Sequence, residues 1–282
     1  MKIPFGLHII KFDGGLGNQM FEYAFYKALR LKFPFALYAF DTYASDISHN
    51  GYELETIFNI DSKTERNRYA FYRKLERHNY VDFSLVKEDN YMTYCPNVYE
   101  DILSPHEWIG FWQTEKYFIH IEEKIRKIFK FREALLSKRT RQLADEIRNF
   151  KNPISVHVRR GDYMAIDSTK TFGLEYYNAA ISLLRNMYAG EKLIVFSDDV
   201  NWCRENLCFD NMIFVDWNRG VDSWQDMYLM SLCKLNIIAN SSFSWWGAWL
   251  NNNKEKQVIA PLKWMKEEPE NSDIIPNSWI RI

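Results

Sequence analysis

The amino-acid sequence predicts an α/β fold built on parallel sheets. Its second half alternates short apolar runs with helical patterns, an order typical of a parallel sheet with helices on both faces. Its first half opens with a strand, a glycine turn, a helix and a second strand. Strands are predicted over residues 7–12, 35–40, 109–113, 154–160, 193–197, 212–215, 235–239 and 257–260.

Helices are predicted where apolar residues recur at helical spacing. The first begins after the glycine turn, where Asn18 is expected to serve as its N-cap. The charged run 63–77 indicates a solvated helix face, and residues 41–107 otherwise show no clear pattern. The remaining helices are predicted over residues 115–130, 133–149, 174–188, 200–206, 222–234 and 241–251.

A domain boundary is expected at Asn152-Pro153, because this pair interrupts the regular pattern. It divides the chain into a domain of residues 1–152 and a domain of residues 153–282. A chain of 282 residues is long enough for two modest domains that share a cleft, or for one large domain. Its 47% apolar content supports a sizeable core and argues against disorder.

The charge balance excludes a broad basic surface. Lys and Arg number 36 and Asp and Glu number 37, so general binding to nucleic acid is not expected. No apolar run approaches 18 residues, so no membrane span is expected, and the N-terminal pattern does not resemble a signal peptide. The four cysteines form no C-x-x-C pair, which favours a reduced, cytoplasmic chain. A peripheral position on the inner face of the membrane stays open.

Charged side chains follow the first predicted strand of the second half. His157, Arg159, Arg160 and Asp162 all lie in or just after the strand of residues 154–160. Adjacent guanidinium groups match phosphate oxygens in fork geometry, so this segment predicts a grip on a nucleotide phosphate. The alternative is an ordinary salt bridge between Arg160 and Asp162.

Two further strand ends carry polar groups, Asp198-Asp199 and Asn240-Ser241-Ser242. A parallel sheet gathers such groups at its carboxyl edge, where ligands bind. The serines open a helix, whose free N–H groups can hold a phosphate, so the arginines and serines together predict a diphosphate clamp. Helix capping by these serines or by Asp199 is the alternative. Paired carboxylates also suit Mg²⁺, although an acceptor role toward a base or ribose is preferred here.

The glycine turn of Gly14, Gly15 and Gly17 is a weak signal alone. Its spacing differs from the G-x-G-x-x-G fingerprint of dinucleotide binding. The chain also lacks a G-x-x-x-x-G-K-[ST] loop and a recognisable nucleophile elbow. These absences argue against the corresponding ATP-binding and hydrolase chemistries.

Four motifs together resemble the α-1,2-fucosyltransferases of glycosyltransferase family 11. They occur in the order of that family and span residues 14 to 249. They are Gly14-Gly-Leu-Gly-Asn-Gln-Met-Phe21, His157-Val-Arg-Arg-Gly-Asp162, Phe196-Ser-Asp-Asp199 and Ala239-Asn-Ser-Ser-Phe-Ser-Trp-Trp-Gly-Ala-Trp249. One position departs from the expected pattern, because Glu22 stands where the resemblance leads us to expect Gln.

The resemblance implies a GT-B-like fold, in which two Rossmann-type domains face a cleft. It also implies GDP-β-L-fucose as donor, inversion at the fucose anomeric carbon, and no required metal or other cofactor. Asn18 would lie near the reacting centre. The donor would be held through its diphosphate by Arg159, Ser241 and Ser242, through its guanine by Phe243, and through its ribose or base by His157, Asp198 and Asp199.

The expected activity is that of a galactoside 2-α-L-fucosyltransferase. Residues 1–152 would hold a galactose-terminated oligosaccharide or lipid-linked glycan, and residues 153–282 would bind GDP-fucose. Arg159, Asn18 and Asp162 are the expected catalytic residues. Asp13 and Asp162 are the candidates for a general base, and a base-free route stays open. The alternatives are another fucosyl linkage or donor, and a nucleotide-sugar or glycan binding protein without turnover.

Overall fold

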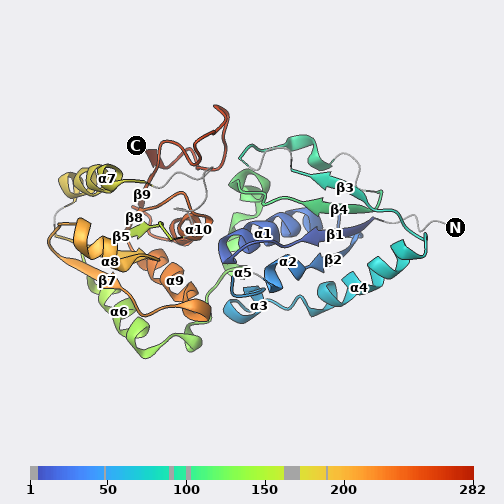
Figure 1. Cartoon of the computed structure of the whole chain (residues 1–282), viewed down its shortest axis with the longest axis horizontal. Coiled ribbons are helices and arrows are strands. Elements are labelled where there is room, and N and C mark those ends of the chain that lie inside the picture. The colour runs from blue at the N-terminus through green and yellow to red at the C-terminus, as the bar shows by residue number, and fades with distance from the viewer. Residues whose placement is uncertain (1–5, 48, 89–91, 100–102, 162–171, 189) are drawn as a thin grey trace. The chain divides into compact units, whose positions relative to one another are not determined.

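The structure is a computed structural model, and it describes residues 6–47, 49–88, 92–99, 103–161, 172–188 and 190–282. The chain forms two compact units. The first unit comprises Met1–Arg132 with Pro269–Ile274, and the second comprises Glu133–Glu268 with Ile275–Ile282. Each unit contains one sheet whose strands are all parallel (Figure 1). No helix in the described ranges is both long enough and apolar enough to cross a membrane.

The sheet of the first unit has four strands in the order β2-β1-β4-β3. Its central strand β1 pairs with β2 on one side and with β4 on the other. Strand β1 therefore lies inside the sheet, and the glycine turn follows its carboxyl end. The strands are β1 (Leu7–Lys11), β2 (Leu37–Asp41), β3 (Ser84–Lys87) and β4 (His106–Ile109).

Helices cover both faces of this sheet. Helix α4 (Lys63–Arg77) packs Tyr72 on one face, in a cluster with Ile9. Helix α1 (Leu16–Lys32) covers the other, where the rings of Tyr26 and Tyr38 lie 5.3 Å apart. The shorter helices are α2 (Tyr43–Asp46), α3 (Leu54–Ile57) and α5 (Glu122–Ile128), with 3₁₀ turns at Pro96–Tyr99, Glu115–Tyr117 and Ile119–Ile121.

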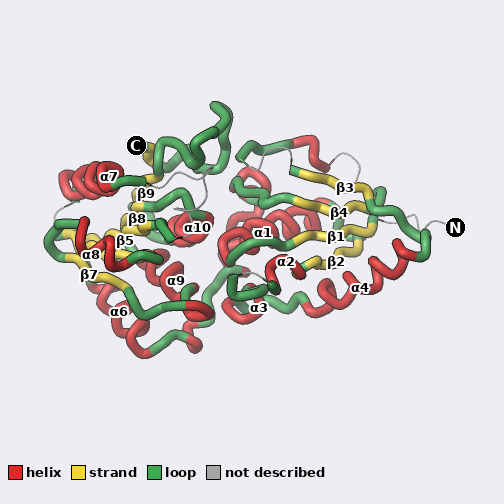
Figure 2. The backbone as a smooth tube through the Cα atoms, in the orientation of Figure 1, coloured by secondary structure: helices red, strands yellow, loops and turns green. Residues whose placement is uncertain are grey.

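The sheet of the second unit has six strands in the order β10-β9-β8-β5-β6-β7. After β5 the chain adds β6 and β7 on one side, and then crosses to add β8, β9 and β10 on the other (Figure 2). The order of the strands therefore reverses between β5 and β8. The strands are β5 (Asn152–Val158), β6 (Glu191–Ser197), β7 (Met212–Val215), β8 (Leu235–Ile237), β9 (Gln257–Ala260) and β10 (Ile280–Arg281).

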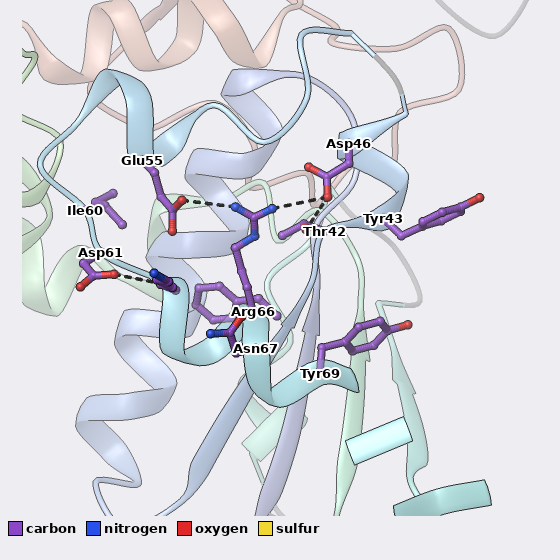
Figure 3. A pocket seen from close by; sticks show the side chains of 11 residues that line it. Thr42, Tyr43, Asp46, Glu55, Ile60, Asp61, Arg66, Asn67 and Tyr69 are labelled. Atoms are coloured by element: carbon purple, nitrogen blue, oxygen red, sulfur yellow. Dashed lines mark hydrogen bonds and ion pairs between the residues drawn. The ribbon is translucent and has the colours of Figure 1, made fainter. Parts of the chain in front are cut away.

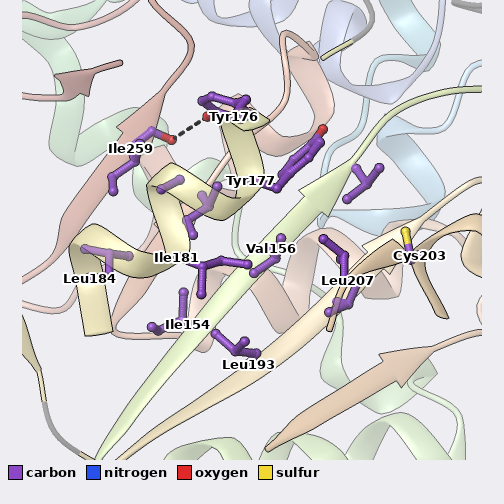
Figure 4. Packing of buried hydrophobic residues seen from close by; sticks show 14 of the residues in the cluster. Ile154, Val156, Tyr176, Tyr177, Ile181, Leu184, Leu193, Cys203, Leu207 and Ile259 are labelled. Atoms are coloured by element: carbon purple, nitrogen blue, oxygen red, sulfur yellow. Dashed lines mark hydrogen bonds between the residues drawn. The ribbon is translucent and has the colours of Figure 1, made fainter. Parts of the chain in front are cut away.

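Alternate residues of these strands face different helices. Helices α7 (Leu174–Met187) and α8 (Val200–Asn206) pack against Val156, Leu193 and their neighbours on one face (Figure 4). On the other face, the Asn236 side-chain amide donates to the carbonyl of Met230 in α9 (Trp224–Leu232) over 2.9 Å. Helix α10 (Ser242–Leu250) packs beside α9, as does α6 (Lys138–Asn149).

The predicted α/β class is therefore confirmed, as are most elements of the second half. The strand predicted over 109–113 is wrong, because β4 ends at Ile109. The amides of Phe111 and Trp112 donate to the Glu88 carboxylate rather than to a neighbouring strand. Trp112 also has a φ of 54°, which is incompatible with a strand. The single helix predicted over 115–130 is also wrong. Tyr117 and Phe118 are adjacent and both fully buried, and two short 3₁₀ turns accommodate them before α5.

Asn152 and Pro153 do not interrupt the structure, because they are the first two residues of β5. Proline is tolerated at the start of a strand, so the pair does not end the pattern there. Helix α6 belongs to the second unit, and the amide of its N-cap residue Ser137 donates to the side chain of Gln225 in α9 over 2.9 Å. The assignment of acceptor to residues 1–152 and donor to residues 153–282 stays a prediction.

Candidate active site

The topology of the second unit brings three predicted site segments together. Strand β5 lies between β6 and β8, and all three run in the same direction. The residues that follow their carboxyl ends therefore share one edge of the sheet. This edge includes the point where strand order reverses, which is where open α/β sheets bind ligands.

His157 is buried near the end of β5, on the face covered by α9 and α10. It is 6% exposed, and its ring centroid lies 5.9 Å from that of Phe243. Burial, helped by the charge of Arg159, lowers the pKa of His157 to about 4. The imidazole is therefore neutral at neutral pH, and it offers a hydrogen bond rather than a charge to a ligand.

The two arginines after β5 have different surroundings. Arg159 forms an ion pair with Asp198, with 3.2 Å between Nη1 and Oδ2. Arg160 pairs with Asp199 over 3.4 Å, and its guanidinium lies 4.1 Å from the centre of the Trp202 ring. Arg160 is thus held by a carboxylate and an aromatic ring together. Asp162 lies outside the described residues, and with it the alternative salt bridge to Arg160.

The two aspartates after β6 hold the local backbone in place. Asp198 accepts a 2.9 Å hydrogen bond from the amide of Arg160, and a Cβ at Gly161 would lie 2.7 Å from its Oδ2. Asp199 accepts from the amide of Trp202 over 3.1 Å, so its helix-capping alternative is confirmed. Contact with ribose or base stays a prediction. In the described part of the chain, no three His, Cys, Asp or Glu residues are grouped as a metal centre requires.

Helix α10 begins after β8 at Ser242, with Ser241 as its N-cap residue. The Ser241 side chain makes no capping hydrogen bond. The sequence places hydroxyls at both positions, so the helix start offers hydroxyls and backbone N–H groups at the carboxyl edge of the sheet. Phe243 is half-buried, whereas Trp245 and Trp246 are fully buried. The donor-binding roles of Ser241, Ser242 and Phe243 stay predictions.

The glycine turn connects β1 to α1 in the first unit. Gly14 has a φ of 75°, and a Cβ there would lie 2.5 Å from the side-chain nitrogen of Asn18. The helix starts at Leu16 with Gly15 as N-cap, and Gly17 lies in its first turn. The predicted capping role of Asn18 is therefore wrong, because the turn starts the helix earlier. Asn18 instead accepts a 2.8 Å hydrogen bond from the Gln113 side chain, a partner that no sequence signal indicated.

Glu22 holds the backbone that leads into the glycine turn. Its two carboxylate oxygens accept from the amide of Asp13 over 3.0 and 3.2 Å, and its side chain is fully buried. Burial raises the pKa of Glu22 well above its ordinary value. Burial likewise raises the pKa of Glu88 to about 7, although this carboxylate accepts from the amides of Phe111 and Trp112. The sequence showed that position 22 departs from the expected Gln, but it did not indicate this contact with Asp13.

We expect Glu22→Gln to stabilise the chain increasingly as the pH rises. The glutamine oxygen still accepts from Asp13, but no carboxylate must stay buried. The pKa of Glu22 is higher in the folded chain than its ordinary value of 4.5, so the folded chain loses stability as the pH rises from 4.5 through the folded-state pKa. The loss is at most about 1.4 kcal/mol for each unit between the two pKa values. The measurement is the thermal midpoint at pH 5 and pH 8. Glu123→Gln, at an exposed position of α5, is the control, and equal shifts at both pH values would contradict the expectation.

Comparison with solved structures places the fold among the glycosyltransferases of the GT-B type. The fucosyltransferase NodZ from Bradyrhizobium superposes with a TM-score of 0.55 at 14% identity, over 86% of this chain and 92% of that one. The sequence then gives the family. The chain belongs to glycosyltransferase family 11, whose sequence model, described as Glycosyl transferase family 11, matches residues 5–282.

Two Escherichia coli proteins are similar over almost their whole length. An α-1,2-colitosyltransferase is 36% identical, over 97% of this chain and 98% of its own. The O-antigen biosynthesis glycosyltransferase WbnK is 30% identical, over 96% of this chain and 98% of its own. The galactoside α-(1,2)-fucosyltransferase 1 of Sus scrofa is 27% identical, over 84% of this chain and 64% of its own.

Proposed function

We propose that this chain transfers L-fucose from GDP-β-L-fucose to the 2-hydroxyl of a terminal β-galactoside. Family 11 membership supports a glycosyl transfer, and the names of the similar α-(1,2)-fucosyltransferases support the sugar and the linkage. The observation that carries the donor assignment is the grouping of Arg159 with the start of α10 at the carboxyl edge of one sheet.

In the proposed reaction, the galactose 2-hydroxyl attacks the anomeric carbon of fucose. The bond from that carbon to the diphosphate breaks, GDP leaves, and the configuration inverts. Charge grows on the leaving diphosphate and on an oxocarbenium-like sugar in the transition state. Arg159 and the N–H groups at the start of α10 would stabilise the diphosphate, because both offer positive electrostatic potential that is in place beforehand.

The hydroxyl proton needs an acceptor, and Asp13 is the described candidate. Its amide is fixed by Glu22, while its carboxylate is 46% exposed and lies 3.5 Å from Lys11 Nζ. A carboxylate held this way keeps access to a ligand proton. Asp162 and a base-free route are the other possibilities proposed from the sequence.

A second donor follows from the similar α-1,2-colitosyltransferase, which is 36% identical to this chain. Colitose lacks the 3-hydroxyl of fucose, so the two GDP-sugars differ at one position of the sugar ring. The test offers GDP-fucose and GDP-colitose separately and in competition, with a β-galactoside as acceptor, and determines the linkage of the product. A clear kcat/KM preference for GDP-fucose and an α-1,2 product support the proposal, and preference for GDP-colitose would replace the donor.

The same assay also distinguishes an enzyme from a protein that binds the nucleotide sugar or the glycan without turnover. GDP release that depends on the galactoside identifies an enzyme. Saturable binding of GDP-fucose without GDP release, in the presence of galactosides, would identify a binding protein instead.

We expect transfer activity to persist in EDTA. Arg159 and the helix start already supply positive potential for the leaving diphosphate, whereas Asp198 and Asp199 are engaged with the backbone and with arginines. Initial rates with EDTA and with added Mg²⁺ or Mn²⁺ should agree within a few-fold. Complete loss in EDTA, with recovery on adding a metal ion, would assign metal ligation to this aspartate pair.

A further inference from the structure

An open cavity lies in the first unit, at the carboxyl end of β2. Its volume is about 760 Å³, which falls within the range of small-ligand sites. The segments around it are the end of β2, helix α2, helix α3 and the start of α4. The lining residues that matter for its chemistry are Tyr43, Asp46, Glu55, Asp61, Arg66 and Asn67.

The charges of this cavity disfavour an anionic occupant. Its lining contains three carboxylates and two cationic side chains. Arg66 lies between Glu55 and Asp46, with nitrogen–oxygen distances of 3.2 and 3.7 Å (Figure 3). Two carboxylates therefore flank this one guanidinium, and the lining as a whole carries one carboxylate more than cations, so its net charge is unfavourable for a phosphate.

The cavity instead has the chemistry that neutral sugars require. Carboxylate and amide oxygens accept hydrogen bonds from hydroxyl groups, and the amide nitrogen of Asn67 donates. Tyr43 is 68% exposed, so its ring offers an apolar surface for the C–H face of a sugar. Tyr69 adds a second ring to the lining, and in the view of Figure 3 both rings lie to the right of Arg66.

Hydrogen bonds connect the segments next to the cavity with the glycine turn. The amide of Phe12 donates to the carbonyl of Asp41, the residue before the cavity-lining Thr42, over 2.8 Å. The Gln19 side chain then bridges the carbonyls of Gly14 and Gly51 over 3.0 and 2.9 Å. The loop that follows α2 is thereby tied to the turn next to Asp13.

We propose that this cavity binds a neutral saccharide unit of the acceptor, one attached to the galactose that reacts. This inference rests on the proposed function, since it assumes a galactoside acceptor near the glycine turn. In this proposal, Tyr43 and Asn67 determine the preference of the enzyme for long over short acceptors. The diphosphate of a lipid carrier would not occupy the cavity, because carboxylates outnumber cations there.

The test compares full-length wild type with Tyr43→Ala and Asn67→Ala, using GDP-fucose as donor. The acceptors are methyl β-D-galactoside and a neutral tetrasaccharide that ends in β-galactose. The readout is the kcat/KM for the tetrasaccharide divided by the kcat/KM for the methyl galactoside. We expect Tyr43→Ala to lower this ratio about 5- to 10-fold, which is the effect of one lost aromatic contact. Asn67→Ala should lower the same ratio, through KM for the tetrasaccharide. Tyr80→Ala, at an exposed tyrosine outside the cavity, should leave it unchanged.

An unchanged ratio in both cavity variants, with wild-type transfer intact, would overturn the cavity assignment and leave the proposed function standing. If wild type transfers to neither acceptor, the proposed function fails. In that case, calorimetry with the tetrasaccharide tests separately whether the cavity binds a saccharide. Weaker binding in Tyr43→Ala than in Tyr80→Ala supports it, and equal binding, or no binding to wild type, overturns it.

Discussion

Arg159→Lys should lower kcat/KM about 100-fold or more while the chain remains folded. Lysine keeps the positive charge but loses the planar fork that matches a diphosphate, so the two residues are not interchangeable at such a site. Asp198 can still pair with a lysine, since Arg159 forms an ion pair with it over 3.2 Å. The measurements are steady-state kinetics with GDP-fucose and a galactoside, with circular dichroism and the thermal midpoint as checks on folding.

Arg160→Lys is the matched control for this substitution. The guanidinium of Arg160 lies against Trp202 and pairs with Asp199, so its contacts are with the protein itself. We expect this variant to lose some stability and less activity than Arg159→Lys. Near-native rates in a folded Arg159→Lys enzyme would remove Arg159 from the diphosphate clamp. Equal losses in both variants would show that the clamp depends on the arginine pair as a whole.

Phe243→Ala should weaken the binding of GDP and of GDP-fucose by similar factors. Phe243 is half-buried at the start of α10, immediately after the two serines, and its ring lies near His157. Contacts between a base and an aromatic ring contribute about 1–3 kcal/mol in nucleic-acid complexes, which corresponds to about 5- to 150-fold in Kd. Calorimetry measures GDP affinity, and thermal denaturation without ligand measures the midpoint. Lower affinity at an unchanged midpoint is the expected result.

Phe243→Leu separates stacking from packing. Leucine retains apolar volume but has no aromatic face, so this variant should keep the wild-type midpoint while its GDP affinity stays as low as that of the alanine variant. If Phe243 belongs to the core with Trp245 and Trp246, both variants should bind GDP normally in their folded fraction. A lower midpoint in the alanine variant alone would then assign Phe243 to packing.

The sequence determined the class of fold through local patterns. Strand β5 and helix α7 are apparent because each buries one apolar face at its own period, two residues for the strand and 3.6 for the helix. The same order of strands and helices predicted that His157, Asp198 and Ser241 lie at the carboxyl ends of strands of one parallel sheet. Their motifs also gave the family, because such clusters depend on residue type and order along the chain.

Only the tertiary structure decided which neighbours these residues have. The pairing of Arg159 with Asp198, and of Asn18 with Gln113, joins residues 39 and 95 positions apart, and no local pattern encodes such distances. Beyond the end of β4, the amides of Phe111 and Trp112 donate to Glu88, which follows another strand, and no local pattern indicated this partner. The cavity beside Tyr43 likewise forms from a segment without clear periodicity. Local periodicity reports which face of an element is buried, whereas partners and cavities depend on how separate elements pack.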